Sequence, residues 1–594
     1  MKRRLYAMIA LLLALCMLAG CTSGFGDLAE TISGGIAEAI GGKSGDGDQV
    51  HNPDGLKFSE MNYYRPDFDK LSSDVGAVTE ALDSGEDIDR VIELLEVCMD
   101  DYYEFSTMYS LANIYNCKDL RDEYYADEYS WCSEHGSLVS QLFDEMYYAC
   151  AGSSLGPELE EEYFWEGFCE DYADPNDSYY NDVTVALMQE ESELISRYRE
   201  MMADPTITYN GKERSVHELL DELSGYNYLN ALKAYYEKYN EPLAEIYIEL
   251  MRVRTDMATE MGFSSCEEME FSFTFDRDYT PEDAARFVQG VKTYIVPLYI
   301  QADKDGLSYN VSYSKLNSDD LYLNLKGIMT DIGGDCLDAF EFMSEYELYD
   351  IEPNPYKANS SFQTYLDMYE APFIFVNPNG NTGDLLTFVH EFGHYTDAYV
   401  NFDAAETIDL AECYSQGLEF LSLSHMGNVL SDKKVDELRF AKTLDAMDTF
   451  IQQASFADFE SKAHAIGPDG LSAQKLNELS LQAAKDFGYC PAGFEEYMQY
   501  VWMDITHFFE YPFYVISYPV SLEIAMQIYA LELEEEGKGL EKYFEMLPRD
   551  YDTFMETVLG NGLDSPFDES SLAATADVIR RELGYDENLR RSAA

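Results

Sequence analysis

The sequence predicts a mainly helical fold with a small β element near residue 375. Apolar residues recur at helical spacing through most of the chain from residue 57 onward, most clearly over 91–111, 138–148, 183–202, 217–232 and 242–261. The run 371–376 is instead apolar, aromatic and β-branched, and Pro-Asn-Gly-Asn closes it at 378–381. That pattern is typical of a short strand that ends in a turn and leads into the next helix, which Thr382 or Asp384 can cap. The strand could be an edge strand that pairs with another extended backbone, or a purely structural edge strand.

The composition supports a large folded body and excludes some binding partners. Hydrophobic residues make up 46% of the 594 residues, which is enough to bury a sizeable core. The formal net charge of −74, from 113 acidic and 39 basic residues, argues against binding to nucleic acid or to an anionic membrane surface. The eleven cysteines show no CxxC spacing, and we predict no specific disulfide.

The N-terminus has the features of a processing signal. Basic residues at 2–4 precede a short apolar run over 9–17 that is too short for an ordinary membrane span. Leu18-Ala19-Gly20-Cys21 follows and resembles the lipobox of bacterial lipoproteins. The resemblance implies a signal peptide over 1–20, lipid on Cys21, and attachment to the outside of the membrane through this lipid only. The alternative is a plain secretory signal. Gly, Ser and Asp dominate residues 21–56, which we expect to form a flexible linker.

The most informative motif is His390-Glu391-Phe392-Gly393-His394. Residues four apart on a helix lie on one face, so both imidazoles can reach one metal ion, with Glu391 beside them as a general base for water. The chain has only eight histidines, which makes a chance match improbable. The alternative, a pair of surface histidines, fits poorly with the apolar Phe388, Val389 and Phe392 on the same helix.

A catalytic zinc ion needs a third protein ligand. Glu412 and Glu419 each stand among apolar residues, where a buried carboxylate needs a partner. His425 lies thirteen residues after Glu412, about 20 Å along a continuous helix, so these two cannot bind one ion. The remaining downstream candidates are Asp397, Asp403, Glu406 and Asp409.

The motif at 390–394, with Asp409-Leu410-Ala411-Glu412-Cys413-Tyr414-Ser415-Gln416, resembles the M3 family of zinc oligopeptidases, which includes oligoendopeptidase F. This resemblance extends over about 205–583. It implies a helical ellipsoid with a deep central substrate channel. It also implies one Zn²⁺ ion on His390, His394 and Glu412. Where the family often has a further His, this chain has Asp397, either an acceptor beside the metal ligands or a surface residue.

The segment 507–518 resembles the part of the family that lines the site opposite the metal. On that resemblance, His507 and a nearby tyrosine donate hydrogen bonds to the oxyanion that forms during hydrolysis. Tyr511, Tyr514 and Tyr518 are all possible donors, because Ile516 stands where the family often has Tyr. We take Tyr511 and Tyr518 as the candidates.

The predicted function is therefore that of an extracytoplasmic zinc endopeptidase for short peptides, acting as a monomer. Residues 57–204 form an N-terminal helical region and 205–590 the catalytic region. One alternative is a zinc carboxypeptidase, although no Lys or Arg that could hold a terminal carboxylate lies between Val376 and Lys433. The other is a tethered peptide-binding lipoprotein that has lost catalysis.

Overall fold

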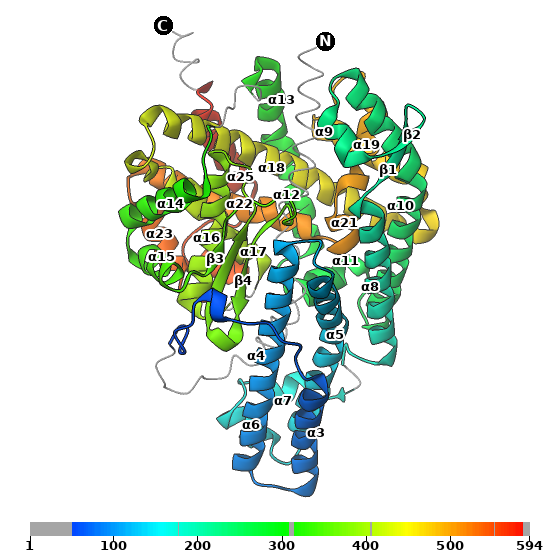
Figure 1. Ribbon diagram of the computed structural model, residues 1–594, viewed down its shortest axis with the longest axis vertical. Helices are drawn as coiled ribbons and strands as arrows, with labels where there is room; N and C mark the ends of the chain where they lie inside the picture. Colours follow the sequence, from blue (N-terminus) through cyan, green and yellow to red (C-terminus); the bar gives the residue numbers. More distant parts are fainter. Residues whose placement is uncertain are drawn as a thin grey trace.

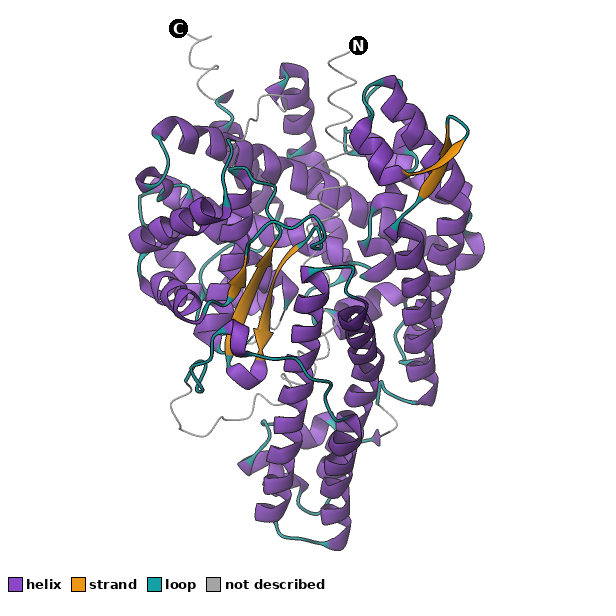
Figure 2. Cartoon of the chain, viewed as in Figure 1, coloured by secondary structure: helices purple, strands orange, loops and turns teal. Residues whose placement is uncertain are grey.

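Helices make up most of the protein, and the strands are few and short, as predicted (Figure 2). The computed structural model describes residues 50–175, 178–307, 314–403, 407–549, 551 and 553–585. The predicted signal peptide, Cys21 and most of the predicted linker lie outside these described residues.

The first long helices form a bundle that projects at the lower end of the molecule in Figure 1. Asp67 and Asp87 cap the first two helices, because each side chain accepts a hydrogen bond from the backbone three residues later. The bundle has its own buried cluster, which includes Leu95 and Phe105. Its helices are α3 (Phe68–Ser84), α4 (Ile88–Lys118), α5 (Glu123–Gly152), α6 (Gly156–Glu162) and α7 (Phe168–Asp171).

A second group of helices, on the right in Figure 1, carries a β-hairpin. The hairpin strands are β1 (Thr206–Tyr209) and β2 (Lys212–Ser215), and Asn210 and Gly211 between them have positive φ angles of 51° and 76°. An Asn-Gly pair favours this tight turn. The helices of the group are α8 (Asp182–Ala203), α9 (Val216–Glu222), α10 (Tyr226–Glu260) and α19 (Ala473–Asp486).

The larger sheet corrects one expectation. Its strands are β3 (Tyr349–Asp350), β4 (Ser361–Leu366) and β5 (Ala371–Val376), in the order β3-β5-β4. The predicted strand 371–376 is therefore β5, the fully buried central strand, and not an edge strand that a peptide could pair with. The edge beside it is β4, which runs antiparallel to β5 in the register Ser361↔Val376 to Leu366↔Ala371.

The helices around this sheet form the left part of the molecule in Figure 1. Helix α18 (Asp432–Ile466) crosses the upper part, and one hydrophobic core extends from Phe58 to Leu583. The helices around the sheet are α14 (Ser318–Ile332), α15 (Gly334–Tyr346), α16 (Gly383–Asn401), α17 (Ile408–Ser422), α22 (Ser517–Glu534), α23 (Lys538–Met546) and α25 (Glu569–Glu582). The others are α11 (Cys266–Met269), α12 (Pro281–Tyr294), α13 (Val296–Asp305), α20 (Glu495–Met498), α21 (His507–Glu510) and α24 (Phe554–Gly560).

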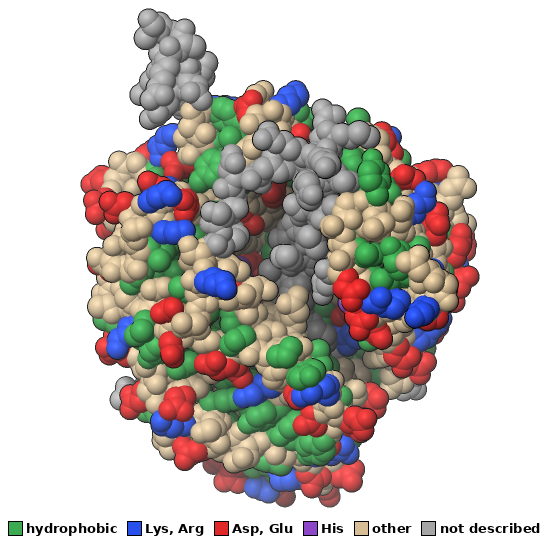
Figure 3. Space-filling model, turned by 45° about the horizontal axis from the view of Figure 1, so that its top comes forward, with side chains coloured by type: hydrophobic (Ala, Val, Ile, Leu, Met, Phe, Trp, Pro, Cys, Tyr) green, Lys and Arg blue, Asp and Glu red, His purple; other side chains and the backbone are tan. Residues whose placement is uncertain are grey.

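The surface reflects the acidic composition. On the face shown in Figure 3, Asp and Glu side chains spread over much of the surface, with Lys and Arg interspersed among them. Among the described residues, no helix is both long enough and apolar enough to cross a membrane.

Candidate metal centre and active site

Helix α16 presents the two histidines of the motif. Its apolar residues Leu385, Phe388, Val389 and Phe392 are fully buried, whereas His390 and His394 remain partly exposed. The two imidazole rings lie one helical turn apart, with centroids separated by 5.0 Å.

The turn before α16 is stabilised by Asp384. Its carboxylate accepts hydrogen bonds from the backbone N–H of Asn379, at 3.0 Å, and of Asn381, at 2.7 Å. Thr382, the other predicted cap, makes no capping bond to α16, and its hydroxyl instead accepts from the backbone of Ser314. Asp384 therefore fixes how the chain leaves β5 and enters the metal-binding helix.

Gly393 allows α16 and α17 to approach each other closely. A Cβ atom at residue 393 would lie 2.5 Å from Ser415 Cα and 2.8 Å from the Tyr414 carbonyl oxygen. Both are backbone atoms that cannot move aside, so only glycine fits between His390 and His394 without moving α17. The close contact brings Glu412 of α17 to the histidines of α16.

His390, His394 and Glu412 form the group of metal-binding side chains predicted from the sequence. One donor atom from each lies within 4.8 Å of the other two, and His390 Nε2 is 3.5 Å from Glu412 Oε2. Two imidazole nitrogens and one carboxylate oxygen are the donor set of His₂Glu zinc sites. The residues present therefore fit a catalytic metal ion.

Glu412 is buried and held in place by its own helix. Its Oε2 accepts hydrogen bonds from Ser415 Oγ at 3.1 Å and from Gln416 Nε2 at 3.4 Å. Burial raises the pKa of Glu412, and the nearby His390 and these two hydrogen bonds partly oppose the rise. A buried carboxylate of this kind gains stability from a cation beside it.

Behind the metal-binding group lies a second pair of charges. Glu419 Oε1 is 2.9 Å from His390 Nδ1, and Glu419 Oε2 is 2.7 Å from Lys442 Nζ of α18. Burial alone would raise the pKa of Glu419, but Lys442 and His390 outweigh it and lower the pKa. Glu419, one of the candidate ligands in the sequence, thus contacts His390 on the ring nitrogen opposite Glu412.

The two histidines have different electrostatic surroundings. Burial disfavours the charged form of His390, but Glu412 and Glu419 outweigh it and raise its pKa to about 9. Burial, with the charge of His390, lowers the pKa of His394 well below its usual value, against a hydrogen bond to the backbone of Ala411. His394 is therefore a neutral ligand at physiological pH, whereas His390 must release a proton when a metal ion binds.

Glu391 has the properties expected of a general base. It is buried, and no group in the described part of the chain donates a hydrogen bond to its Oε2. Burial and, to a smaller extent, Glu412 and Glu419 raise its pKa to about 8, although His390 opposes the rise. A buried carboxylate oxygen without a partner, next to a metal-binding group, is positioned to take up a proton.

Two of the residues predicted to line the site opposite the metal, His507 and Tyr518, lie in contact. His507, in α21, is buried, and its Nε2 lies 3.4 Å from the hydroxyl of Tyr518, in α22. Gln416 joins this wall to the metal side, because its Nε2 also donates to the Tyr518 carbonyl at 3.3 Å. The ring centroid of Tyr511, four residues after His507, lies 6.3 Å from that of Tyr514. Burial lowers the pKa of His507 to about 4, so the imidazole is neutral at physiological pH.

The structure also shows where Asp397 and His425 lie. Asp397 is buried, not on the surface, and forms a two-point ion pair with Arg549 at 2.7 and 3.0 Å. His425 lies beyond the end of α17 at Ser422, and its Nδ1 is 2.8 Å from Asp331. Neither side chain belongs to the metal-binding group.

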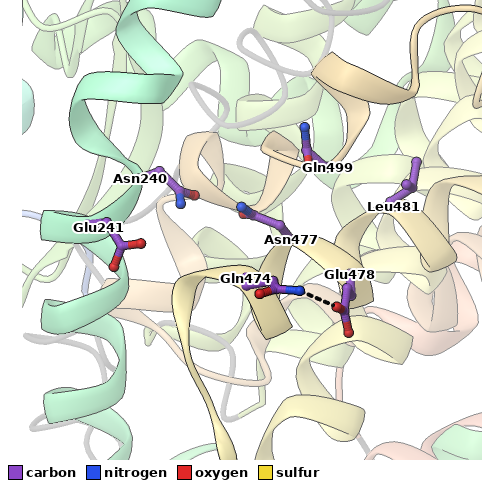
Figure 4. Close-up of a pocket in the computed structure, with 7 residues that line it drawn as sticks. All are labelled: Asn240, Glu241, Gln474, Asn477, Glu478, Leu481 and Gln499. Carbon is purple, nitrogen blue, oxygen red and sulfur yellow. Dashed lines mark hydrogen bonds between the residues drawn. The ribbon is translucent and has the colours of Figure 1, made fainter.

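A polar pocket of about 260 Å³ lies elsewhere, between α10 and α19 (Figure 4). Amide and carboxylate side chains dominate its lining, and the Gln474 side chain donates to Glu478 there. None of the predicted site residues lines it. The lining residues are Asn240, Glu241, Gln474, Asn477, Glu478, Leu481 and Gln499.

Comparison with known proteins agrees with these observations. Residues 58–168 match the model of the peptidase M3 N-terminal domain, and residues 335–550 match that of peptidase family M3. An oligoendopeptidase F homolog of Lactococcus lactis is 26% identical over 271 residues, 43% of this chain and 44% of the relative. The oligopeptidase PepF of Bacillus subtilis is 25% identical over 266 residues, 43% of this chain and 38% of the relative. The chain thus aligns with less than half the length of these relatives.

The fold is shared over a much longer stretch. The solved structure of PZ peptidase A with an inhibitor superposes with a TM-score of 0.75 at 22% identity, covering 89% of this chain and 99% of that one. The long helices, the small sheet and the paired helices α16 and α17 therefore belong to an architecture already known. Taken with the two domain matches, this shows that the chain has an oligoendopeptidase F-like fold and that residues 58–168 and 335–550 are similar to the N-terminal and peptidase domains of family M3.

Proposed function

We propose that this protein is a zinc-dependent oligoendopeptidase that hydrolyses internal bonds of short peptides. The observation that carries the proposal is the convergence of His390, His394 and Glu412 beside Glu391, whose buried Oε2 has no partner among the described residues. The M3 domain matches and the oligoendopeptidase F relatives support the same reaction class.

The donor set favours zinc as the metal. Two imidazoles and one carboxylate, contributed by two helices, are three ligands of the kind that hold a catalytic zinc ion, which would keep a further position for water or substrate. Held by these three residues, Zn²⁺ would supply a Lewis acid that makes water nucleophilic at neutral pH and polarises the peptide carbonyl.

The protein's own residues then handle the protons. Glu391 takes the proton of the attacking water and passes it to the leaving amine, a role for which its buried Oε2, without a partner among the described residues, is placed. Glu419 accepts a hydrogen bond from His390 Nδ1, so that His390 Nε2 is the nitrogen directed at the metal. Lys442 keeps Glu419 ionised for this role.

On the opposite wall, Tyr518 and His507 together supply the donor to the oxyanion. The neutral imidazole of His507 has one N–H, and when its Nε2 donates this to the Tyr518 oxygen, the Tyr518 hydroxyl can donate its own proton to the oxyanion. Donors fixed before the reaction stabilise charge as it develops. Tyr511 is the second tyrosine candidate.

The edge strand β4 is suited to bind an extended peptide. Only one side of β4 is paired in the described sheet, and the other side can form backbone hydrogen bonds with a substrate strand.

We further propose that the protein acts outside the cytoplasm, attached to the membrane by lipid on Cys21. The support is the sequence Leu18-Ala19-Gly20-Cys21 after a short apolar run, with a linker rich in Gly and Ser behind it. Metabolic labelling with a clickable palmitate analogue tests this, and labelling of a Cys21→Ser variant equal to that of the natural protein would overturn it.

The enzymatic proposal is tested by mapping cleavage of a peptide blocked at both ends. The zinc-loaded protein should cut internal bonds, and the Glu391→Gln variant should bind zinc equally but cleave about 100- to 10,000-fold more slowly. Cleavage that resists a chelator, or that is undiminished in the variant, would overturn the proposal. Release of single residues from an unblocked C-terminus, without internal cleavage, would point to the carboxypeptidase alternative.

A further inference from the structure

A buried ion pair lies at the start of the helix that supplies Glu412. Asp409 stands one turn before Glu412 in α17 and is fully buried. Arg277 Nε lies 3.2 Å from Asp409 Oδ2, and the hydroxyl of Tyr279 donates to Asp409 Oδ1 at 3.1 Å. Both carboxylate oxygens thus accept hydrogen bonds, and Arg277 is linked to α17, the helix that carries Glu412.

The same guanidinium also holds the opposite wall. Arg277 Nη2 donates to the carbonyl oxygen of Phe513 at 3.0 Å and to the hydroxyl of Ser517 at 2.7 Å. Phe513 has a left-handed φ of 62°, which is uncommon for a bulky residue and has to be maintained by its surroundings. Ser517 is the first residue of α22 and directly precedes Tyr518.

The surroundings of Arg277 restrict its movement. The guanidinium carbon lies 4.5 Å from the ring centroids of both Phe271 and Phe275, and the backbone N–H of Arg277 donates to the Phe271 carbonyl at 2.8 Å. The side chain is fully buried, and its Nη1 meets no acceptor among the described residues. A planar fork held between aromatic rings has one available orientation.

We propose that Arg277 is a positioning residue that sets the distance between the metal-binding side and the oxyanion wall of the site. It joins Asp409, one turn before Glu412, to Phe513 and Ser517, which flank the segment that ends at Tyr518. The inference rests on the proposed function, since it assigns a role within that site. In the described part of the chain, the Arg277 side chain donates hydrogen bonds to Asp409, Phe513 and Ser517, and not to the metal-binding side chains or the candidate donors.

Lysine cannot replace arginine in this role. Its single ammonium group can serve either the carboxylate or the two oxygens of the wall, but it lacks the fork that reaches all three. An Arg277→Lys variant therefore keeps the positive charge beside Asp409 while losing the link. The effect of this variant therefore reports the loss of the link between the two segments, and not the free-energy cost of an unpaired Asp409 carboxylate in the interior.

The first test is hydrogen exchange of the intact zinc-loaded protein, followed by mass spectrometry. Arg277→Lys should speed exchange about threefold or more in peptides from 408–416 and 507–518, with other helices unchanged. Ser517→Ala, a milder change, should affect 507–518 alone. Arg252→Met, which removes an exposed ion pair with Asp469, is the matched control. Unchanged exchange in both segments, or faster exchange spread over all helices, would overturn the proposal.

The second test separates catalysis from folding and metal binding. Per zinc-loaded, folded molecule, Arg277→Lys should lower kcat about 10- to 100-fold, with KM and zinc affinity within about threefold of the natural protein. An unchanged kcat would assign Arg277 a structural role only. If the natural protein cleaves no peptide, the proposed function fails, whereas the hydrogen-exchange result still decides whether Arg277 links the two segments.

Discussion

Glu419 lies between His390 and Lys442, with one carboxylate oxygen 2.9 Å from His390 Nδ1 and the other 2.7 Å from Lys442 Nζ. All three side chains come from different helices, α16, α17 and α18. This arrangement fixes the orientation of the His390 ring and directs its Nε2 toward Glu412.

Neutralising Glu419 should weaken metal binding. A Glu419→Gln variant keeps the shape of the side chain but loses the charge that favours His390 as a ligand, so the Kd for zinc should rise about 10- to 100-fold. Competition with a chromophoric chelator measures this directly. Glu437→Gln, at a half-buried carboxylate of α18 paired with Lys434, is the control. Equal zinc affinity in Glu419→Gln and the natural protein would remove Glu419 from the metal centre.

Adding a methyl group at Gly393 should separate α16 from α17. The new Cβ would lie 2.5 Å from Ser415 Cα, and we expect Gly393→Ala to lower the free energy of unfolding by about 1–3 kcal/mol and to weaken zinc binding. Gly427→Ala is the matched control, since a Cβ there meets no atom within 4 Å. Urea unfolding measures the stability of both variants. If both lose equally little stability, the contact at Gly393 does not determine how closely α16 and α17 approach each other.

The two tyrosine candidates should differ in their effect on catalysis. The Tyr518 hydroxyl lies 3.4 Å from His507 Nε2, whereas the Tyr511 ring lies 6.3 Å from that of Tyr514, so Tyr518→Phe should lower kcat about 100-fold with little change in KM. Tyr511→Phe should have the smaller effect. Steady-state kinetics on one fluorogenic peptide suffices, and a larger loss in Tyr511→Phe would reverse the assignment.

His507 should make the protein less stable in acid. Burial lowers the pKa of His507 from its usual 6.5 to about 4. Between these values the unfolded chain binds the proton and the folded protein does not. The free energy of unfolding therefore falls as the pH falls from 6.5 to 4, by at most about 3 kcal/mol, and this contribution is constant above 6.5.

A His507→Asn variant isolates this effect, because asparagine does not titrate. Urea unfolding at several pH values should show a shallower loss of stability between pH 6.5 and 4 for the variant than for the natural protein. Parallel curves would mean that His507 takes up its proton normally in the folded protein.

Local sequence patterns predicted the features that depend on neighbouring residues. The spacing of His390 and His394 determines that they share a helix face, and the recurrence of apolar residues at helical spacing predicts most helices. Glu412 could be predicted as the third ligand from the resemblance to the M3 family, although its apolar neighbours alone left Glu419 open as well. In the structure, Glu412 lies within reach of both histidines, whereas Glu419 lies behind His390.

Local sequence patterns did not predict the contacts between segments that are far apart in the chain. Lys442 lies 23 residues after Glu419 and Arg277 lies 132 residues before Asp409, and nothing near either residue in sequence indicates its partner. The strand 371–376 was predicted correctly as a strand, but not its central place, since strand order depends on how β3 and β4 return to it. Asp397 likewise forms a buried ion pair with Arg549, which is far from it in the sequence.

The most direct test of the central claim is a zinc titration of the metal-free protein with peptide hydrolysis as the readout. Activity should rise linearly and reach its maximum at about one zinc ion per chain, since His390, His394 and Glu412 form one site. Glu412→Ala should need far more zinc to gain any activity. Full activity without added metal, or zinc binding that is unchanged in Glu412→Ala, would contradict the proposed metal centre.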